Sequence, residues 1–92
     1  MNVDALKAFR KQMKECDAET RLRVFDAMNL AAAAFGQPHL HSGRGIRELG
    51  KGMYECRAGI HLRLLFKREA DTLLFEFAGS HDEVRAWIKN RR

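Results

Sequence analysis

The pattern of apolar and polar positions predicts two helices in the first third of the chain. In residues 4–15, apolar side chains recur every three or four positions, as on one face of an α-helix: Leu6, Phe9 and Met13. Asn2 or Asp4 can cap this helix by accepting backbone N–H bonds. The pattern then breaks, and Asp17 is the predicted N-cap of a second helix over residues 18–35.

The second predicted helix has an expected buried face and a well-marked end. Its buried face is predicted to consist of Leu22, Phe25, Met28, Ala32 and Phe35. Alanines at positions 31–34 favour a helix and let another element pack close to it. Gly36 suits the left-handed conformation that ends many helices, and Pro38 prevents continuation. The two segments therefore form a helical hairpin, whose cations are interpreted as solvated: Lys7, Arg10 and Arg21.

Three short runs of alternating apolar and polar residues follow, and each predicts a β-strand. They lie at residues 53–57, 62–67 and 72–78, after a short extended lead-in at residues 46–49. One face of this meander is predicted to carry Tyr54, Cys56, Leu62, Leu64, Phe66, Leu73, Phe75 and Phe77. The opposite face carries more polar residues. The pattern therefore favours an antiparallel sheet with one face on the helices and the other partly open.

A final helix is predicted after residue 79. Ser80 and Glu83 have the spacing of a capping box, and an apolar stripe follows at Val84, Trp87 and Ile88. The whole pattern predicts an α+β fold, with an N-terminal helical hairpin packed on a small antiparallel sheet and a short C-terminal helix. The sheet is expected to have three strands, or four if a stub at residues 1–3 pairs into it.

Length, composition and charge restrict the class of protein. The chain has 92 residues, which suits a single domain over residues 1–92. No apolar run approaches the roughly 20 residues needed to cross a membrane, and residues 1–15 contain no apolar signal-peptide core. We therefore expect a cytoplasmic protein, with Cys16 and Cys56 as reduced thiols. The net charge of +5 favours nucleic acid or an acidic segment as partner.

Two arginines and two histidines form the candidate site. Arg57, His61 and Arg63 lie on the polar face of the predicted strands, and His81 begins the final helix, so the meander can bring them to one end of the sheet. Arginine offers a rigid fork of donors to phosphate, and histidine titrates near neutral pH. RNA cleavage needs a base for the 2′-hydroxyl, an acid for the leaving oxygen and cations for the phosphate, which this set can supply. Exposed strand faces also carry Arg, Lys and His for solubility alone, so the residue types leave both interpretations open.

Two stretches resemble a known superfamily of toxins. The run Arg-Glu-Leu-Gly-Lys-Gly-Met-Tyr-Glu-Cys-Arg at residues 47–57, followed by Leu-Arg-Leu-Leu-Phe at residues 62–66, resembles the RelE/ParE toxin superfamily, and its HigB-like members in particular. The segment Ala-Gly-Ser-His-Asp at residues 78–82 resembles the end of the last strand in YafQ-like members. Two helices before the meander and a short helix after it also agree with this superfamily.

The resemblance implies the toxin of a toxin–antitoxin pair. RelE-, HigB- and YafQ-like members cut mRNA in the ribosomal A site without a metal or other cofactor, and a cognate antitoxin neutralises them. Arg63 matches the strand arginine at the scissile phosphate, His81 the catalytic position after the last strand, and Arg57 the arginine that ends the preceding strand. His61 falls near an acid/base position of YafQ-like members. The expected RNA-binding residues are Lys51, Arg47, Lys67 and Arg44.

Departures from the family keep other functions open. RelE-like enzymes carry lysines where this chain has Met53 and Glu55, and a glutamate facing the RNA backbone would repel it. A ParE-like inhibitor of DNA gyrase and an inert basic adaptor with the same fold are therefore alternatives, although an acid/base histidine pair favours the nuclease over the gyrase inhibitor. His39 and His41 have no third ligand nearby in the sequence, so we expect no metal site.

Overall fold

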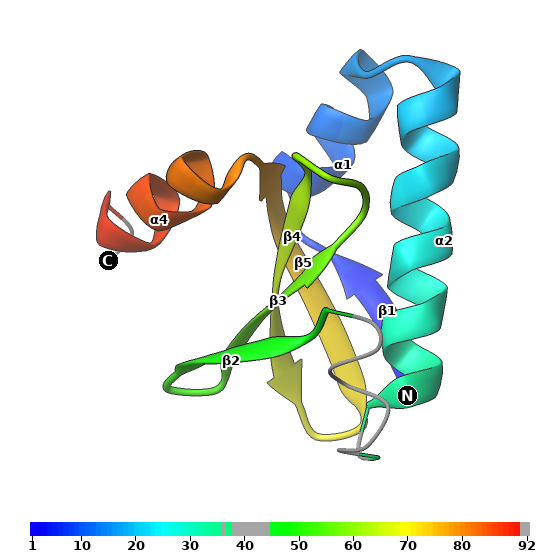
Figure 1. Ribbon diagram of the computed structural model, residues 1–92. Coiled ribbons are helices and arrows are strands. Elements are labelled where there is room, and N and C mark those ends of the chain that lie inside the picture. The colour runs from blue at the N-terminus through cyan, green and yellow to red at the C-terminus, as the bar shows by residue number, and fades with distance from the viewer. Residues whose placement is uncertain (36, 38–44, 91–92) are drawn as a thin grey trace.

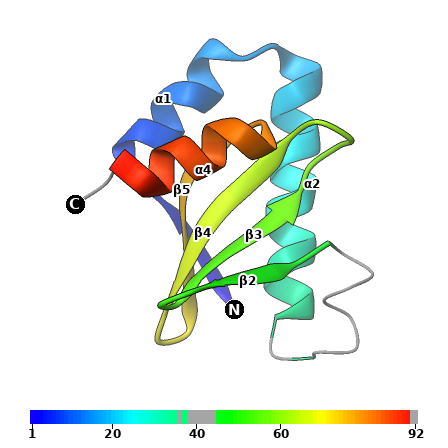
Figure 2. The ribbon, with the colours of Figure 1, turned by 60° about the vertical axis from the view of Figure 1, so that its left-hand side comes forward.

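Two helices, a mixed sheet and a further helix make up the fold, which confirms the predicted α+β class. The computed structural model describes residues 1–35, 37 and 45–90. Its elements are β1 (Asn2–Ala5), α1 (Lys7–Glu15), α2 (Ala18–Ala34), β2 (Arg47–Gly50), β3 (Met53–Arg57), β4 (Arg63–Glu69), β5 (Thr72–Gly79) and α4 (His81–Asn90). Helices α1 and α2 cover one face of the sheet, and α4 lies on the opposite side (Figure 1, Figure 2).

The sheet has five strands in the order β1-β5-β4-β3-β2, so the expectation of three or four strands is wrong. The antiparallel meander is present as predicted, and the extended lead-in forms its edge strand β2. The stub left open at residues 1–3 is the strand β1, which pairs in parallel with β5 through Asn2–Ala5. The four residues of β1 are enough to form an edge strand, because β5 is longer and pairs with all four of them.

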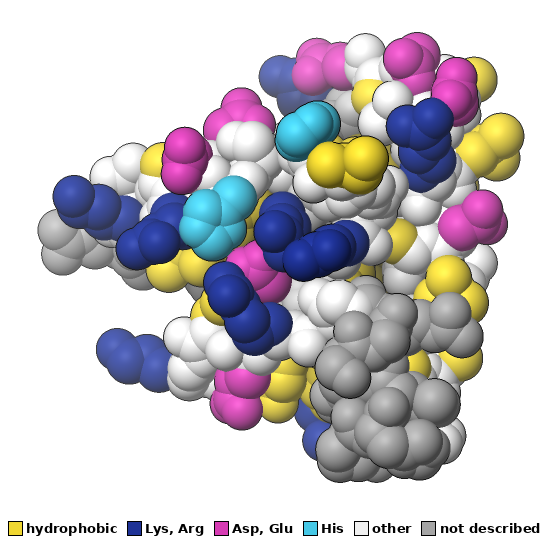
Figure 3. Space-filling model, in the orientation of Figure 1, with side chains coloured by type: hydrophobic (Ala, Val, Ile, Leu, Met, Phe, Trp, Pro, Cys, Tyr) yellow, Lys and Arg dark blue, Asp and Glu magenta, His cyan; other side chains and the backbone are white. Residues whose placement is uncertain are grey.

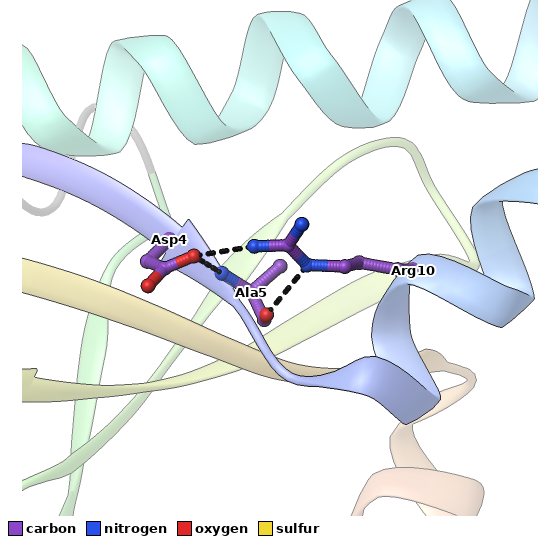
Figure 4. Close-up of polar contacts among 3 residues, drawn as sticks. All are labelled: Asp4, Ala5 and Arg10. Carbon is purple, nitrogen blue, oxygen red and sulfur yellow. Dashed lines mark hydrogen bonds and ion pairs between the residues drawn. The ribbon is translucent and has the colours of Figure 1, made fainter.

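The junction between β1 and α1 differs from the sequence prediction. The first helix begins at Lys7 rather than at residue 4, and Asp4 lies in the strand instead of capping the helix. One Asp4 oxygen accepts the Ala5 N–H at 2.8 Å and an Arg10 Nη2–H at 2.6 Å, while Arg10 Nε donates to the Ala5 carbonyl at 2.9 Å (Figure 4). Arg10 is exposed, as predicted, but its guanidinium group is hydrogen-bonded to the end of β1. These bonds explain why the chain leaves the strand and turns directly into a helix.

Helix α2 begins as predicted, and its buried face agrees with the prediction at Met28 and Phe35 but not at Leu22 and Phe25. The Asp17 side chain accepts the Thr20 N–H at 2.7 Å, which confirms the N-cap. The buried side chains of the helix are Val24, Ala27, Met28, Ala31 and Ala34. Leu22 and Phe25 were predicted to be buried but are 65% and 42% exposed. The helix carries apolar residues on all of its sides. The side with the small alanines faces the core, because it allows the closest approach to the sheet.

Arg21 was predicted to be solvated and instead joins the two helices. Its Nε donates to the Met13 carbonyl at 2.8 Å, and its Nη2 donates to the Cys16 carbonyl at 2.9 Å. These carbonyls lie at the end of α1, where backbone acceptors have no partner within the helix. Lys7, by contrast, is exposed as expected. Gly36 and Pro38, which were expected to end α2, lie outside the described residues.

The main core lies between the sheet and the helical hairpin. Aromatic rings from neighbouring strands line up across it, with centroid distances of 5.7 Å from Tyr54 to Phe66 and 4.9 Å from Phe66 to Phe75. Phe9 of α1 continues this row at 5.9 Å from Phe75. Cys56 is buried in the same cluster, and burial, followed by the nearby Glu55 charge, raises the pKa of its thiol to about 12. A thiol in this environment is unreactive at neutral pH.

A β-bulge in β5 reverses the predicted alternation near its end. Leu65 pairs with Phe77 and Phe66 pairs with Phe75, so Glu76 is an extra residue on β5. Phe75 consequently faces the helical hairpin, whereas Phe77 faces the other side and was wrongly predicted to share the face of Phe75. Phe77 stacks on Trp87 of α4 with a centroid distance of 4.7 Å. The bulge thus provides the contact that holds α4 against the sheet.

The side chain of Gln12 fixes the end of β5 that leads into α4. Strand β1 pairs with β5 only through residues 72–75. Beyond that point, Gln12 Nε2 donates to the Ala78 carbonyl at 2.8 Å, and Gln12 Oε1 accepts the Ala78 N–H at 2.9 Å. The amide of Gln12 therefore acts as one further rung of the ladder and joins α1 to the strand that carries the candidate site.

We expect Gln12→Ala to lower the free energy of unfolding by about 1–3 kcal/mol, because the buried Ala78 N–H and carbonyl both lose their partner. Urea denaturation followed by circular dichroism measures this change. Gln37→Ala is the matched control, since Gln37 is exposed, and it should change stability by less than ~0.5 kcal/mol. Equal effects of the two substitutions would contradict the ladder role of Gln12.

Candidate functional site

A cleft with cationic walls lies between α4 and the edge of the sheet. It has a volume of about 340 Å³. The residues that line it are Arg47, Leu49, Glu55, His81, Val84, Arg85, Ile88 and Lys89. Lys and Arg side chains gather there around a histidine and a carboxylate (Figure 3). The cleft therefore combines positive charge, an imidazole ring and an apolar wall.

The register of the sheet determines which side chains meet near this cleft. Arg47 pairs with Glu55, and Arg57 pairs with Arg63, so each pair shares a face of the sheet. Arg63 also pairs with Gly79, two residues before His81. The start of β4, the end of β5 and the start of α4 therefore lie together. Of the four residues predicted to converge at one end of the sheet, Arg57, Arg63 and His81 lie there.

The turn from β5 into α4 is held by a capping box and by a glycine. The Ser80 N–H donates to Glu83 Oε1 at 2.8 Å, and the Glu83 N–H donates to Ser80 Oγ at 3.1 Å, which confirms the predicted box. A Cβ at Gly79 would lie 2.8 Å from the Phe77 ring and 3.0 Å from the Glu83 Cβ. Only glycine lets the helix start this close to the strand, and this close start puts His81 at the cleft.

Glu55 lies at the floor of the cleft and binds two arginines from neighbouring strands. The residue is 2% exposed. Its Oε1 lies 3.2 Å from Arg47 Nη2, and its Oε2 lies 3.6 Å from Arg63 Nη1. The sequence suggested that this glutamate would face and repel an RNA backbone. In the structure it is buried beneath two guanidinium groups. Their two positive charges exceed its single negative charge by one.

The other predicted site residues occupy different positions. His61 lines a separate hollow of about 450 Å³ beside the start of α2, together with Thr20 and Arg23, and it does not line the α4 cleft. Arg57 is exposed and lies against Gly45, where a Cβ would come within 3.1 Å of its Cγ. The two catalytic histidines suggested by the sequence are thus in separate hollows.

The predicted RNA-binding residues are also dispersed. Arg47 lines the cleft, and Lys51 is exposed at the turn between β2 and β3. Lys67 lies farther along β4, opposite Met53, with its Nζ 3.4 Å from Glu69. Arg44 lies outside the described residues.

Two cleft residues were missed in the sequence. Arg85 and Lys89 line the cleft beside His81, and the three residues are spaced by four along α4. Residues four apart lie on one face of a helix. That spacing was the signal available in the sequence.

The part of the chain that the structure describes shows neither a metal-binding group nor a membrane-spanning helix. Within it, no group of three or more His, Cys, Asp or Glu side chains is arranged to hold a metal ion. His39 and His41 lie outside the described residues. None of the helices in residues 1–35 and 45–90 is both long enough and apolar enough to cross a membrane.

Comparison with known proteins identifies the fold. No protein-family model and no curated sequence matches the chain. Among solved structures, the chain is similar to the RelE–RelB complex of Pyrococcus horikoshii, with 14% identity and a TM-score of 0.66 over 86% of this chain and 92% of that one. It is similar to Escherichia coli YafQ, with 19% identity and a TM-score of 0.63 over 90% and 96% of the two chains.

A third similar structure is the YoeB–YefM complex of Staphylococcus aureus, with 12% identity and a TM-score of 0.65 over 88% of this chain and 97% of that one. All three comparisons cover nearly the whole of both chains, so the likeness extends to the complete arrangement of helices and sheet. The resemblance drawn from the sequence is confirmed at the level of the fold, and the chain has the RelE-like toxin fold.

Proposed function

We propose that the chain is the toxin of a type II toxin–antitoxin pair and cuts mRNA on the ribosome. The similar structures include toxin–antitoxin complexes. The observation that carries the nuclease assignment is the cleft at which Arg47, Glu55 and His81 meet, with Arg63 paired to Glu55 beside it. A ribosomal target makes the cytoplasm the place of action. The RelE-like enzymes that the sequence resembles need no metal or other cofactor for this reaction.

The cleft residues suit the chemistry of RNA cleavage. In this reaction the 2′-oxygen attacks the adjacent phosphorus, the bond to the 5′-oxygen breaks, and that oxygen takes up a proton. Arg63 and Arg47 are suited to hold the phosphate and to offset the charge that develops on it. His81 is suited to transfer the proton, because imidazole changes its charge near neutral pH. Arg85 and Lys89 add positive charge along the path of the RNA backbone.

Of the two histidines predicted to act as acid and base, the cleft favours His81. It lies in the cationic cleft, whereas His61 lines the hollow beside α2. A gyrase inhibitor of the ParE type needs no group that transfers protons, and the location of His81 beside the arginines supports the nuclease over that alternative. An inert adaptor likewise needs no such arrangement.

Expression of the protein without a partner should arrest growth, and translation should stop before DNA synthesis, because the proposed substrate is mRNA on the ribosome. Pulse labelling with methionine and thymidine after induction measures both rates. A primary fall in thymidine incorporation together with an SOS response would move the protein to the gyrase inhibitors, and no growth effect would support the inert adaptor.

Arg63→Ala and His81→Ala should each reduce cleavage of mRNA on programmed ribosomes by about 10²–10⁴-fold, the range typical of a lost acid/base or phosphate-binding group. Primer extension maps the cuts, and circular dichroism verifies folding. Neither side chain belongs to the buried hydrophobic clusters, and the capping box does not use the ring of His81. Lys7→Ala, on the exposed side of α1, is the control. Folded variants that cut at the parental rate would refute the site assignment.

The antitoxin is proposed to lay an acidic amphipathic helix into a groove between α1 and α2. This groove has a volume of about 470 Å³, with an apolar floor that includes Phe9, Phe25 and Met28. Arg10, Lys14 and Arg21 line it as well and give it positive charge. Apolar floor and cationic rim together are complementary to a helix that is apolar on one side and acidic on the other.

Phe25→Ala should weaken binding of the antitoxin at least about 10-fold, because exposed aromatic anchors contribute much of the energy of such interfaces. Leu30→Ala is the matched control, since Leu30 is 44% exposed on the same helix, Phe25 is 42% exposed, and Leu30 does not line the groove. Calorimetric titration with the protein encoded beside this gene measures both affinities. Equal loss in the two variants, or none in either, would argue against the groove.

A further inference from the structure

Glu55 is the one carboxylate that lines the α4 cleft among the described residues, and its two oxygens are in different situations. Oε1 accepts a hydrogen bond from Arg47 Nη2 at 3.2 Å. Oε2 is buried and has no hydrogen-bond partner among the described residues, although Arg63 Nη1 lies 3.6 Å away. A separation of 3.6 Å is an ion pair but is too long for a hydrogen bond. Native proteins rarely leave such a buried acceptor unsatisfied, so this oxygen needs an explanation.

The charges of this cluster, defined as Arg47, Glu55 and Arg63, do not cancel. Two guanidinium groups share one carboxylate, which leaves one positive charge in excess. A phosphodiester carries one negative charge, so a single phosphate balances the cluster. Arg63 also keeps its N–H donors for another acceptor, because its contact with Glu55 is a charge contact without a hydrogen bond.

We propose that Glu55 is a positioning residue that holds Arg47 and Arg63 side by side so that both can bind one RNA phosphodiester. This inference rests on the proposed nuclease function and adds to it the role of a residue that the sequence made unfavourable. Two guanidinium groups repel each other in the absence of an anion. The buried carboxylate offsets this repulsion in the free protein, and the phosphate completes the neutralisation when RNA arrives.

The location of Glu55 supports positioning over direct contact with RNA. Its side chain is only 3% exposed, whereas the side chains of Arg47 and Arg63 are 62% and 22% exposed. The arginines therefore lie between the carboxylate and the solvent, and RNA meets them first. Glu55 also lies within β3, paired with Arg47 of β2 on one side and Leu65 of β4 on the other, so its backbone is fixed on both sides.

The test compares Glu55→Gln with Glu48→Gln. Glutamine keeps the size of the side chain at residue 55 and removes its charge. Glu48 lies on the neighbouring strand, is exposed, and pairs with Tyr54 on the opposite face of the sheet, so its substitution makes the same change in net charge away from the cleft. We expect Glu55→Gln to lower kcat on programmed ribosomes by about 10²-fold, the cost of misplacing a catalytic contact by about 1 Å. KM should not rise, because the added positive charge favours RNA, and Glu48→Gln should leave kcat unchanged.

A spectroscopic measurement separates positioning from a merely structural role. The Nε–Hε signal of Arg63 in ¹⁵N-labelled protein, identified by its loss in Arg63→Ala, should show a rigid side chain in the parent and in Glu48→Gln. In Glu55→Gln it should become mobile while circular dichroism stays native. An equally rigid Arg63 in the folded Glu55→Gln variant would overturn the proposal, and so would cleavage at the parental rate or faster.

Arg47→Ala tests the charge balance if Glu55→Gln does not fold. Arg47 is mostly exposed, so its truncation opens no core cavity. The proposal predicts that Arg63 stays rigid beside Glu55, and that affinity for a short single-stranded RNA falls with a reduction of about one in the slope against log salt. A mobile Arg63 or an unchanged slope would overturn it. If the parent protein cuts no mRNA, the proposed function fails, while the Arg63 signal and the RNA titration still judge the role of Glu55.

Discussion

The buried ion pairing of Glu55 is the interaction on which the candidate site depends. A carboxylate in the middle of a sheet strand costs several kcal/mol of free energy unless cations lie next to it. Arg47 and Arg63 provide these cations from the two adjacent strands, and both contacts follow from the register of β2, β3 and β4. The stability of the sheet and the placement of the arginines are therefore linked. Any change that shifts this register would also separate the charges of the site.

The second wall of the cleft depends on the backbone of β5. The bulge at Glu76 turns Phe77 to the side of α4, where it stacks on Trp87. Gly79 then lets α4 start close to the strand, and the Ser80–Glu83 box fixes its first turn. Without the bulge, the alternation would direct Phe77 into the main core and remove the ring on which α4 rests. An irregularity in one strand thus creates the cleft that a regular sheet would lack.

Sequence patterns predicted the elements and their order because periodicity, caps and turns are local. The Asp17 cap, the Ser80–Glu83 box and the polar face with Arg57 and Arg63 were all correct. Strand β1 was left open because its pairing with β5 spans some seventy residues. The face of α2 was only partly correct, because alanines pack where the larger Leu22 and Phe25 were expected. The role of Glu55 depends on pairing between strands, which residue types alone do not specify.

The candidate site requires that RNA bind in the cleft between β3 and α4. Titrating labelled protein with a short RNA that has a deoxyribose at the cleavage position, and is therefore uncleavable, tests this claim most directly. The NMR shifts should concentrate on Arg47, Arg63, His81 and Arg85 and saturate together. Shifts centred on His61 and Arg23 in the hollow beside α2, with the cleft residues unmoved, would contradict it.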